Sequence, residues 1–152
     1  MIALIQRVTD ASVTVGAEII ASIDRGILAL IAVQPADTES VADRLLERIV
    51  GYRIFDDGEG RMNLALTDIG GELLLVSQFT LAADTRKGMR AGFSTAADPA
   101  TGERLFGYLV DKARGKRLRI ATGRFGSHMH IRLTNDGPVT FWLEVAPTSG
   151  AG

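Results

Sequence analysis

Cysteine is absent from the 152 residues, and histidine occurs only twice. Without cysteine the chain forms no disulfide, no thiolate metal site and no cysteine nucleophile. Long apolar runs are also lacking: Gln6 and Arg7 interrupt the first one, and none reaches the roughly eighteen residues of a membrane-spanning helix. We therefore expect a soluble, cytoplasmic protein.

A large net charge is missing as well. Seventeen basic and eighteen acidic residues give a net charge of −1 at pH 7, so no overall field attracts nucleic acid. RNA contact would need a local basic cluster, and two exist: Arg86, Lys87 and Arg90, and the basic side chains of residues 114–119. Either cluster could equally be an ordinary solvated surface.

The composition that remains is that of a globular protein, with 46% hydrophobic and 23% charged residues. We expect one domain over residues 1–146, followed by a flexible C-terminal tail at residues 147–152.

Hydrophobic patterns in the first third predict strands. Ala11–Val15 and Glu18–Ile23 flank a Gly16-Ala17 turn and should form a hairpin. Gly26–Val33 is apolar without alternation, which indicates a strand buried on both faces.

Two main helices are expected. The first should have its N-cap at Asp37 and end near Gly51, because apolar residues recur at every fourth position between them. The second should have Asp98 as its N-cap, Pro99 at its first position and its end at Gly115.

Further strands are predicted on both sides of the second helix. With the two helices, they favour an α/β fold of layers built on mixed or antiparallel sheets in a single domain. The expected strands are Tyr52–Phe55, which precedes a hairpin turn at Asp56–Gly60, and then Glu72–Gln78, Leu118–Thr122, His128–Leu133 and Val139–Val145.

Ser77–Thr80 is a polar segment at the end of a buried strand. Reactive groups often lie where such a strand enters a loop, because the strand fixes them while the loop leaves access. The alternative is a strand end whose hydroxyl groups only cap the backbone.

Asn135–Thr140 is a second unusual segment, since it places Gly137-Pro138 between two predicted strands. An X-Pro bond readily adopts the cis form, which would point neighbouring carbonyl groups in one direction. A plain hairpin turn fits the sequence equally well.

Other catalytic groups are few. His128 and His130 would face the same side of a strand, but no cysteine or nearby carboxylate completes a metal site. A triad that includes Ser77 stays open, although no Gly-x-Ser-x-Gly motif surrounds it. We therefore expect no metal and no cofactor.

The motifs Ser-Gln-Phe-Thr at residues 77–80 and Asn-x-Gly-Pro-x-Thr at residues 135–140 are both complete and occur in that order. Together they resemble the D-aminoacyl-tRNA deacylase family, of the D-Tyr-tRNA deacylase type. The likeness covers almost the whole chain, including Gln6–Val8, Arg53–Phe55, Met62–Leu64, Asp84–Gly88 and Thr122–Gly126.

The resemblance implies a three-layer, β-rich sandwich and a homodimer that hydrolyses the ester of D-aminoacyl-tRNA. It implies a cis Gly137–Pro138 bond that each subunit lends to its partner's pocket. Carbonyl groups there that bind the α-amino group would leave no room for an L side chain. Glycine has no side chain and would pass this filter, so we expect glycyl-tRNA as a second substrate. The implied sites are the ester site (Ser77, Gln78, Phe79 and Thr80), the chirality site (Gly137, Pro138, Asn135 and Thr140) and the adenosine site (Phe125 and Met129), and we assign the tRNA backbone to Arg86, Lys87 and Arg90.

Ester hydrolysis needs a water nucleophile and stabilisation of an oxyanion. Backbone amides at Gln78, Phe79 or Thr80 are candidates for that stabilisation. Neither motif holds a histidine, so the terminal ribose hydroxyl of the substrate is the simplest activator of water. Thr80 as a covalent nucleophile is the alternative. A tRNA-binding module without activity and an esterase for small D-amino acid esters are the other functions considered.

Some positions depart from the family pattern. Met89, Ala91 and Gly92 replace the usual residues after the Arg-Lys-Gly stretch and could change the stiffness of a loop near the tRNA. His128 stands where the family often has Asp, which puts a carboxylate role there in doubt, and Ser127 replaces a small Ala.

Overall fold

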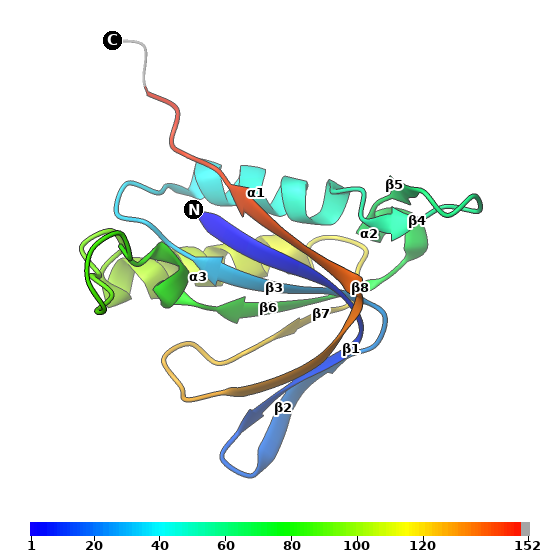
Figure 1. The fold of residues 1–152 in the computed structure, drawn as a ribbon, viewed down its shortest axis with the longest axis horizontal. Helices are drawn as coiled ribbons and strands as arrows, with labels where there is room; N and C mark the ends of the chain where they lie inside the picture. The colour runs from blue at the N-terminus through cyan, green and yellow to red at the C-terminus, as the bar shows by residue number, and fades with distance from the viewer. Residues whose placement is uncertain (150–152) are drawn as a thin grey trace.

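A curled, six-stranded sheet carries the fold in the computed structural model, which describes residues 1–149 (Figure 1). Its path runs β2-β1-β3-β6-β7, and β8 pairs with β1 beside that path. The strands are β1 (Ile2–Val15), β2 (Glu18–Ile23), β3 (Gly26–Ala32), β6 (Glu72–Ser77), β7 (Ile120–Thr122) and β8 (His130–Glu144).

The sheet is mixed, as the sequence predicts. β1 is antiparallel to β2, β3 and β8, whereas β6 is parallel to both β3 and β7. The parallel pair begins with Gly26 opposite Glu72, and a Cβ added at Gly26 would lie 1.8 Å from the Glu72 carbonyl oxygen. Only glycine allows the two strands to approach in this register.

Three layers result from the curl of the sheet. Helices α1 (Glu39–Gly51) and α3 (Pro99–Arg114) cover one face, and their apolar sides share a core with β1, β3 and β6 (Figure 1). A second core, which includes Val13, Leu28 and Val76, fills the space between the β1-β2-β8 and β3-β6-β7 parts of the sheet. The predicted three-layer α/β sandwich is confirmed.

Smaller elements complete the chain. The hairpin turn predicted at Asp56–Gly60 joins the two antiparallel strands of a separate small sheet. No helix among residues 1–149 is long and apolar enough to span a membrane. The smaller elements are β4 (Phe55–Asp56), β5 (Met62–Leu64), helix α2 (Leu66–Ile69) and the 3-10 helix η1 (Phe79–Ala82).

The second predicted helix is confirmed, but the N-cap predicted for the first is wrong. Asp98 caps α3 by accepting the Thr101 amide at 3.0 Å. Helix α1 is capped by Thr38 instead of Asp37. The buried Asp37 carboxylate accepts hydrogen bonds from the Gln34 amide at 2.7 Å and from the Met1 amino nitrogen at 2.8 Å. It therefore does not cap the helix.

The predicted strands are found at the expected places in the chain, but the lengths of some of them differ. The hairpin of β1 and β2 is confirmed, although its first strand extends back to Ile2. The two last predicted strands are one strand, β8, whose halves both pair antiparallel with β1. A plain hairpin turn at Asn135–Pro138 is therefore wrong, because the chain does not reverse there.

The predicted division of the chain at residue 146 stays a prediction. Residues 150–152 of the expected tail lie outside the described residues.

Candidate active site

A cavity of about 460 Å³ opens at the C-terminal end of β6. It lies between η1, the N-terminus of α3 and the segment that precedes β8. The structure therefore brings together most residues that the sequence indicates, namely Ser77, Gln78, Phe79, Phe125, Ser127, His128 and Met129.

The end of β6 leaves two backbone amides unpartnered. The Gln78 amide continues the sheet by donating to the Ile31 carbonyl at 2.7 Å, and the chain then turns into η1. No acceptor within residues 1–149 takes the amides of Phe79 and Thr80. Of the three amides considered from the sequence, Gln78 is thus occupied and the next two are available.

The Thr80 hydroxyl has a hydrogen bond of its own. Its Oγ1 accepts from Nε2 of Gln78, and no histidine or carboxylate donates to or accepts from it within the described chain. The Gln78 side chain therefore orients Thr80, while no base activates it.

The far wall of the cavity is an apolar slot shaped by two glycines. A Cβ at Gly102 would lie 3.6 Å from the Phe125 ring, so the helix backbone faces that ring directly. A Cβ at Gly123 would lie 2.8 Å from Sδ of Met129, so a larger residue there would displace the thioether. The aromatic face and the thioether stand where a flat, unpaired base would fit.

The Asn135–Thr140 segment forms a bulge in β8. Gln6 pairs with Thr140 and Val8 with Asn135, so β8 holds three more residues than β1 over this stretch. Asn135 closes the base of the bulge: its Oδ1 accepts the Val139 amide at 2.7 Å, and its Nδ2 donates to Oγ1 of Thr140 at 2.8 Å. The first and last residues of the motif, Asn135 and Thr140, are thus joined by a hydrogen bond.

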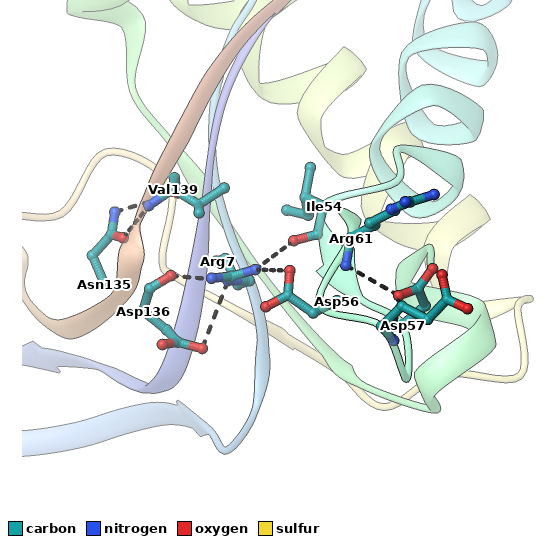
Figure 2. A network of polar contacts seen from close by, with 9 residues as sticks. Arg7, Ile54, Asp56, Asp57, Arg61, Asn135, Asp136 and Val139 are labelled. Carbon is teal, nitrogen blue, oxygen red and sulfur yellow. Dashed lines mark hydrogen bonds and ion pairs between the residues drawn. The ribbon is translucent and has the colours of Figure 1, made fainter. Parts of the chain in front are cut away.

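Arg7 supports this bulge from β1, although the sequence motifs do not include it (Figure 2). Its Nε donates to the Asp136 carbonyl and its Nη1 to the Ile54 carbonyl, both at 2.8 Å. Oδ2 of Asp136 and Oδ1 of Asp56 lie 3.6 and 3.5 Å from its nitrogens. An arginine close to the apolar residues Ile5 and Val8 was the available signal in the sequence, since buried charged groups are usually paired.

The tip of the bulge is tightly defined. Gly137 has φ +141°, and a Cβ there would lie 2.7 Å from Val139 and 3.2 Å from Nη2 of Arg7. The Gly137–Pro138 peptide bond is cis, and both residues are exposed.

Within one chain, the cavity and the bulge do not meet. None of the residues 135–140 lines the cavity. Figure 1 shows β6 ending on the left of the view, while β8 bends at the right. The two sequence motifs are therefore brought to different sides of the same subunit.

In the described part of the chain, each of the two basic clusters keeps two side chains without an ion pair, Lys87 and Arg90 in the first and Lys116 and Arg117 in the second. The loop at Asp84–Gly92 is closed by two backbone hydrogen bonds, at 2.8 and 2.9 Å, between its end residues. Arg86 is paired with Asp84, and these hydrogen bonds lower the pKa of the Asp84 carboxyl to about 2. Lys87 and Arg90 are exposed. In the second cluster, Arg114 is ion-paired to Asp111 at 3.9 Å and Arg119 to Glu72 at 2.9 Å.

The two histidines lie edge to face, with ring centroids 5.1 Å apart. No group of three or more His, Cys, Asp or Glu residues suited to a metal ion is present among residues 1–149.

Comparison with known proteins identifies the family. The model of the family described as D-Tyr-tRNA(Tyr) deacylase matches residues 4–144. D-aminoacyl-tRNA deacylase of Thioalkalivibrio sulfidiphilus is 63% identical over 147 residues, which cover 97% of this chain and 99% of that protein. The same-named protein of Hahella chejuensis is 61% identical over 145 residues, covering 95% and 99%. A solved structure titled c-Myc DNA unwinding element binding protein has a TM-score of 0.92 at 36% identity, covering 97% of this chain and all of that one. The chain therefore belongs to the D-Tyr-tRNA(Tyr) deacylase family, a family of hydrolases.

Proposed function

We propose that the protein hydrolyses the ester between a D-amino acid and the 3′ end of tRNA, releasing free D-amino acid and tRNA, with no cofactor. The observation that carries this proposal is the pair of unpartnered amides at Phe79 and Thr80, beside an apolar slot. Free backbone amides next to the ester can stabilise the oxyanion that forms when water attacks its carbonyl carbon. The family membership supports the same reaction.

The slot accounts for recognition of the substrate. The terminal adenine stacks on Phe125 and contacts Met129, which leaves the ester beside the end of β6. A base and its ribose fit within the cavity of about 460 Å³ and leave room for the amino acid. Ser77 and Gln78 line the space around the scissile bond.

Water activation falls to the substrate in this proposal. Asp98 and His128 also line the cavity, but Asp98 caps α3 through Thr101 and neither belongs to the motif at the end of β6. The hydroxyl of the terminal ribose lies next to the ester in any bound pose, so it can orient and polarise the water. The lack of a base at Thr80 disfavours the covalent route, because a threonine nucleophile needs one.

The chirality site comes from a second subunit. Gly137 and Pro138 are exposed and stand away from their own cavity, and β8 pairs on only one side within the described chain. In a two-fold homodimer, each bulge inserts into the partner's cavity. Its carbonyl groups accept the α-ammonium of the substrate and leave no room for an L side chain. Glycine, which has no side chain, passes the same filter, so glycyl-tRNA is a second substrate.

The tRNA backbone is bound by the basic loop, with Lys87 and Arg90 on the phosphates and Arg86 holding the loop shape through Asp84. Because aminoacyl-tRNA is a substrate of translation, we place the protein in the cytoplasm.

One experiment tests the activity directly. Purified protein is incubated with D- and L-tyrosyl-tRNA prepared on the same tRNA, and the release of each amino acid is followed. Only the D-ester should disappear faster than in a protein-free control. Equal rates on both esters would contradict the proposed chirality site. No hydrolysis of either ester would favour a tRNA-binding module without activity.

The dimer has a separate test. Light scattering should give twice the 16.3 kDa mass of the chain. A monomer with full D-selective activity would contradict the shared site.

A further inference from the structure

Two exposed aromatic rings stand together beside the cavity. Phe79 is 60% exposed and Phe93 is 47% exposed, and their ring centroids lie 5.2 Å apart with the planes tilted by 49°. Phe79 lines the cavity, whereas Phe93 does not, so the pair extends from the cavity mouth onto the surface. Exposed aromatic side chains that cluster in this way are typical of a binding surface.

The position of Phe93 is fixed by the folded chain on both sides of it. Before it, Asp84 and Gly92 pair through their backbones. After it, the Thr95 hydroxyl donates to the Ala82 carbonyl, which anchors the segment to η1. The backbone that carries the ring is thus held by hydrogen bonds on both sides.

The charge next to the rings is positive, although the chain as a whole is not. The loop at residues 84–92 holds three basic residues and one acidic residue, a balance of 3 − 1 = +2, against −1 for the whole chain. Arg86 is taken up by Asp84, which leaves Lys87 and Arg90 as the exposed charges. A partner that suits this surface carries both flat apolar faces and regularly spaced negative charges.

We propose that Phe93 and Phe79 form a stacking platform for a base of single-stranded RNA adjacent to the terminal nucleotide, and that Lys87 and Arg90 bind the phosphates beside it. The platform rests on the proposed function, which puts the terminal nucleotide in the cavity that Phe79 lines. A strand leaving that cavity meets Phe93 next. Paired bases have both faces covered, so only the unpaired 3′ end can stack on the rings.

Binding of uncharged tRNA, followed by fluorescence anisotropy, tests the platform without relying on hydrolysis. Phe93→Ala should weaken binding roughly 5- to 150-fold, the range seen when an aromatic stacking residue is removed. Phe93→Tyr, which keeps a ring, should bind nearly as wild type. Ile19→Ala removes another exposed apolar side chain, 67% exposed on β2, and should bind as wild type.

A truncated tRNA that lacks the unpaired 3′ nucleotides separates stacking from charge. It should bind wild type and Phe93→Ala equally weakly. With intact tRNA, the double substitution Lys87→Ala/Arg90→Ala should reduce the salt dependence, with the slope of log K against log salt becoming shallower by about 1.4 for two phosphates of a single strand. An unchanged slope would contradict the proposed binding of phosphates by Lys87 and Arg90.

Hydrolysis assays then distinguish failure of the platform from failure of the proposed function. Phe93→Ala should raise KM on D-aminoacyl-tRNA with little change in kcat, and should act as wild type on D-aminoacyl-adenosine, which ends at the cavity. Equal losses on both substrates, or unchanged tRNA binding, would overturn the platform. Wild type that binds tRNA through Phe93 but hydrolyses neither ester would keep the platform and overturn the activity.

The competing occupant of the platform is a protein surface of the partner subunit. Light scattering of Phe93→Ala across a dilution series should show the same mass as wild type. A mass that falls toward the monomer on dilution, in this variant alone, would assign the rings to the subunit interface and overturn the proposal.

Discussion

The two sequence motifs of this protein do different physical work. At the end of β6, the amides of Phe79 and Thr80 have no partner among the described residues. In the bulge of β8, by contrast, the amide of Val139 and the side chains of Asn135 and Thr140 bond to one another. In the proposed function, the first motif (Ser77–Thr80, the open motif) supplies groups for chemistry, and the second (Asn135–Thr140, the closed motif) supplies a rigid shape.

The comparison also explains why Arg7 matters. The open motif is fixed by its own strand, because the Gln78 amide continues the pairing with β3. The closed motif interrupts its strand and needs an outside support, which Arg7 provides by joining Asp136 to Ile54. A bulge is held in place by what fills the gap it leaves in the ladder.

The largest effect is expected at the tip of the closed motif. Gly137→Ala places a Cβ 2.7 Å from Val139 at φ +141°, a conformation that costs an L residue about 1–3 kcal/mol. The displaced carbonyl groups should lower kcat/KM on D-aminoacyl-tRNA roughly 100-fold. Gly16→Ala is the matched control, since Gly16 also has a positive φ of 61° but nothing within 4 Å. A wild-type D rate in the first variant would show that the bulge shape is irrelevant to catalysis.

A smaller loss is expected when the support is weakened. Arg7→Lys keeps the charge, but one ammonium group cannot replace the planar fork that reaches both carbonyls. Losing one charge-assisted hydrogen bond of about 1.5–3 kcal/mol should reduce the D rate roughly 10- to 100-fold. Arg48→Lys, which alters an exposed contact to the Glu144 carbonyl, should leave the rate unchanged. Steady-state rates and the D-to-L ratio report the outcome, and equal rates for both variants would contradict the supporting role of Arg7.

Thr80→Ala tests whether the open motif acts through its backbone. Because the variant keeps the amide and loses only the hydroxyl, the D rate should fall by less than about tenfold. Single-turnover kinetics should show no acyl-enzyme in the wild type. Complete loss of turnover with normal binding, together with a trapped acyl-enzyme, would establish the covalent route instead.

The smallest effect concerns the loop that flanks the open motif. The Arg86 side chain and amide hold the pKa of Asp84 near 2, well below its usual value. The ion pair therefore contributes fully above the unfolded pKa of about 3.9 and is lost as the pH falls toward 2. In Arg86→Ala, NMR titration of the Asp84 carboxyl should show a higher pKa, with no change in the D rate on an aminoacyl-adenosine at pH 7. An unchanged pKa would mean that Arg86 does not hold the loop.

Much of the fold could be predicted because its signals are local. The hairpin of β1 and β2, the cap of α3 by Asp98 and the buried strands β3 and β6 all follow from residues close in sequence. Turn, cap and burial patterns act over a few positions, so they can be read without tertiary structure. The two complete motifs identified the family in the same way.

The errors came from groups whose partners lie far along the chain. Asp37 looked like a helix cap, but the Met1 nitrogen 36 positions away takes its carboxylate. Asn135–Pro138 looked like a turn, but pairing of both flanks with β1 makes it a bulge. Local turn chemistry cannot distinguish a reversal from a bulge, because the difference lies in the partner strand.

The sequence by itself determined the α/β class, the family and the residues at the end of β6. Only the tertiary structure decided that Arg7 serves the bulge, because its two acceptors are 129 and 47 positions away. It alone also showed that the two motifs stand on different sides of one subunit and that Phe93 meets Phe79. Strand register and loop closure decide such contacts, and both depend on pairings that no short stretch of sequence contains.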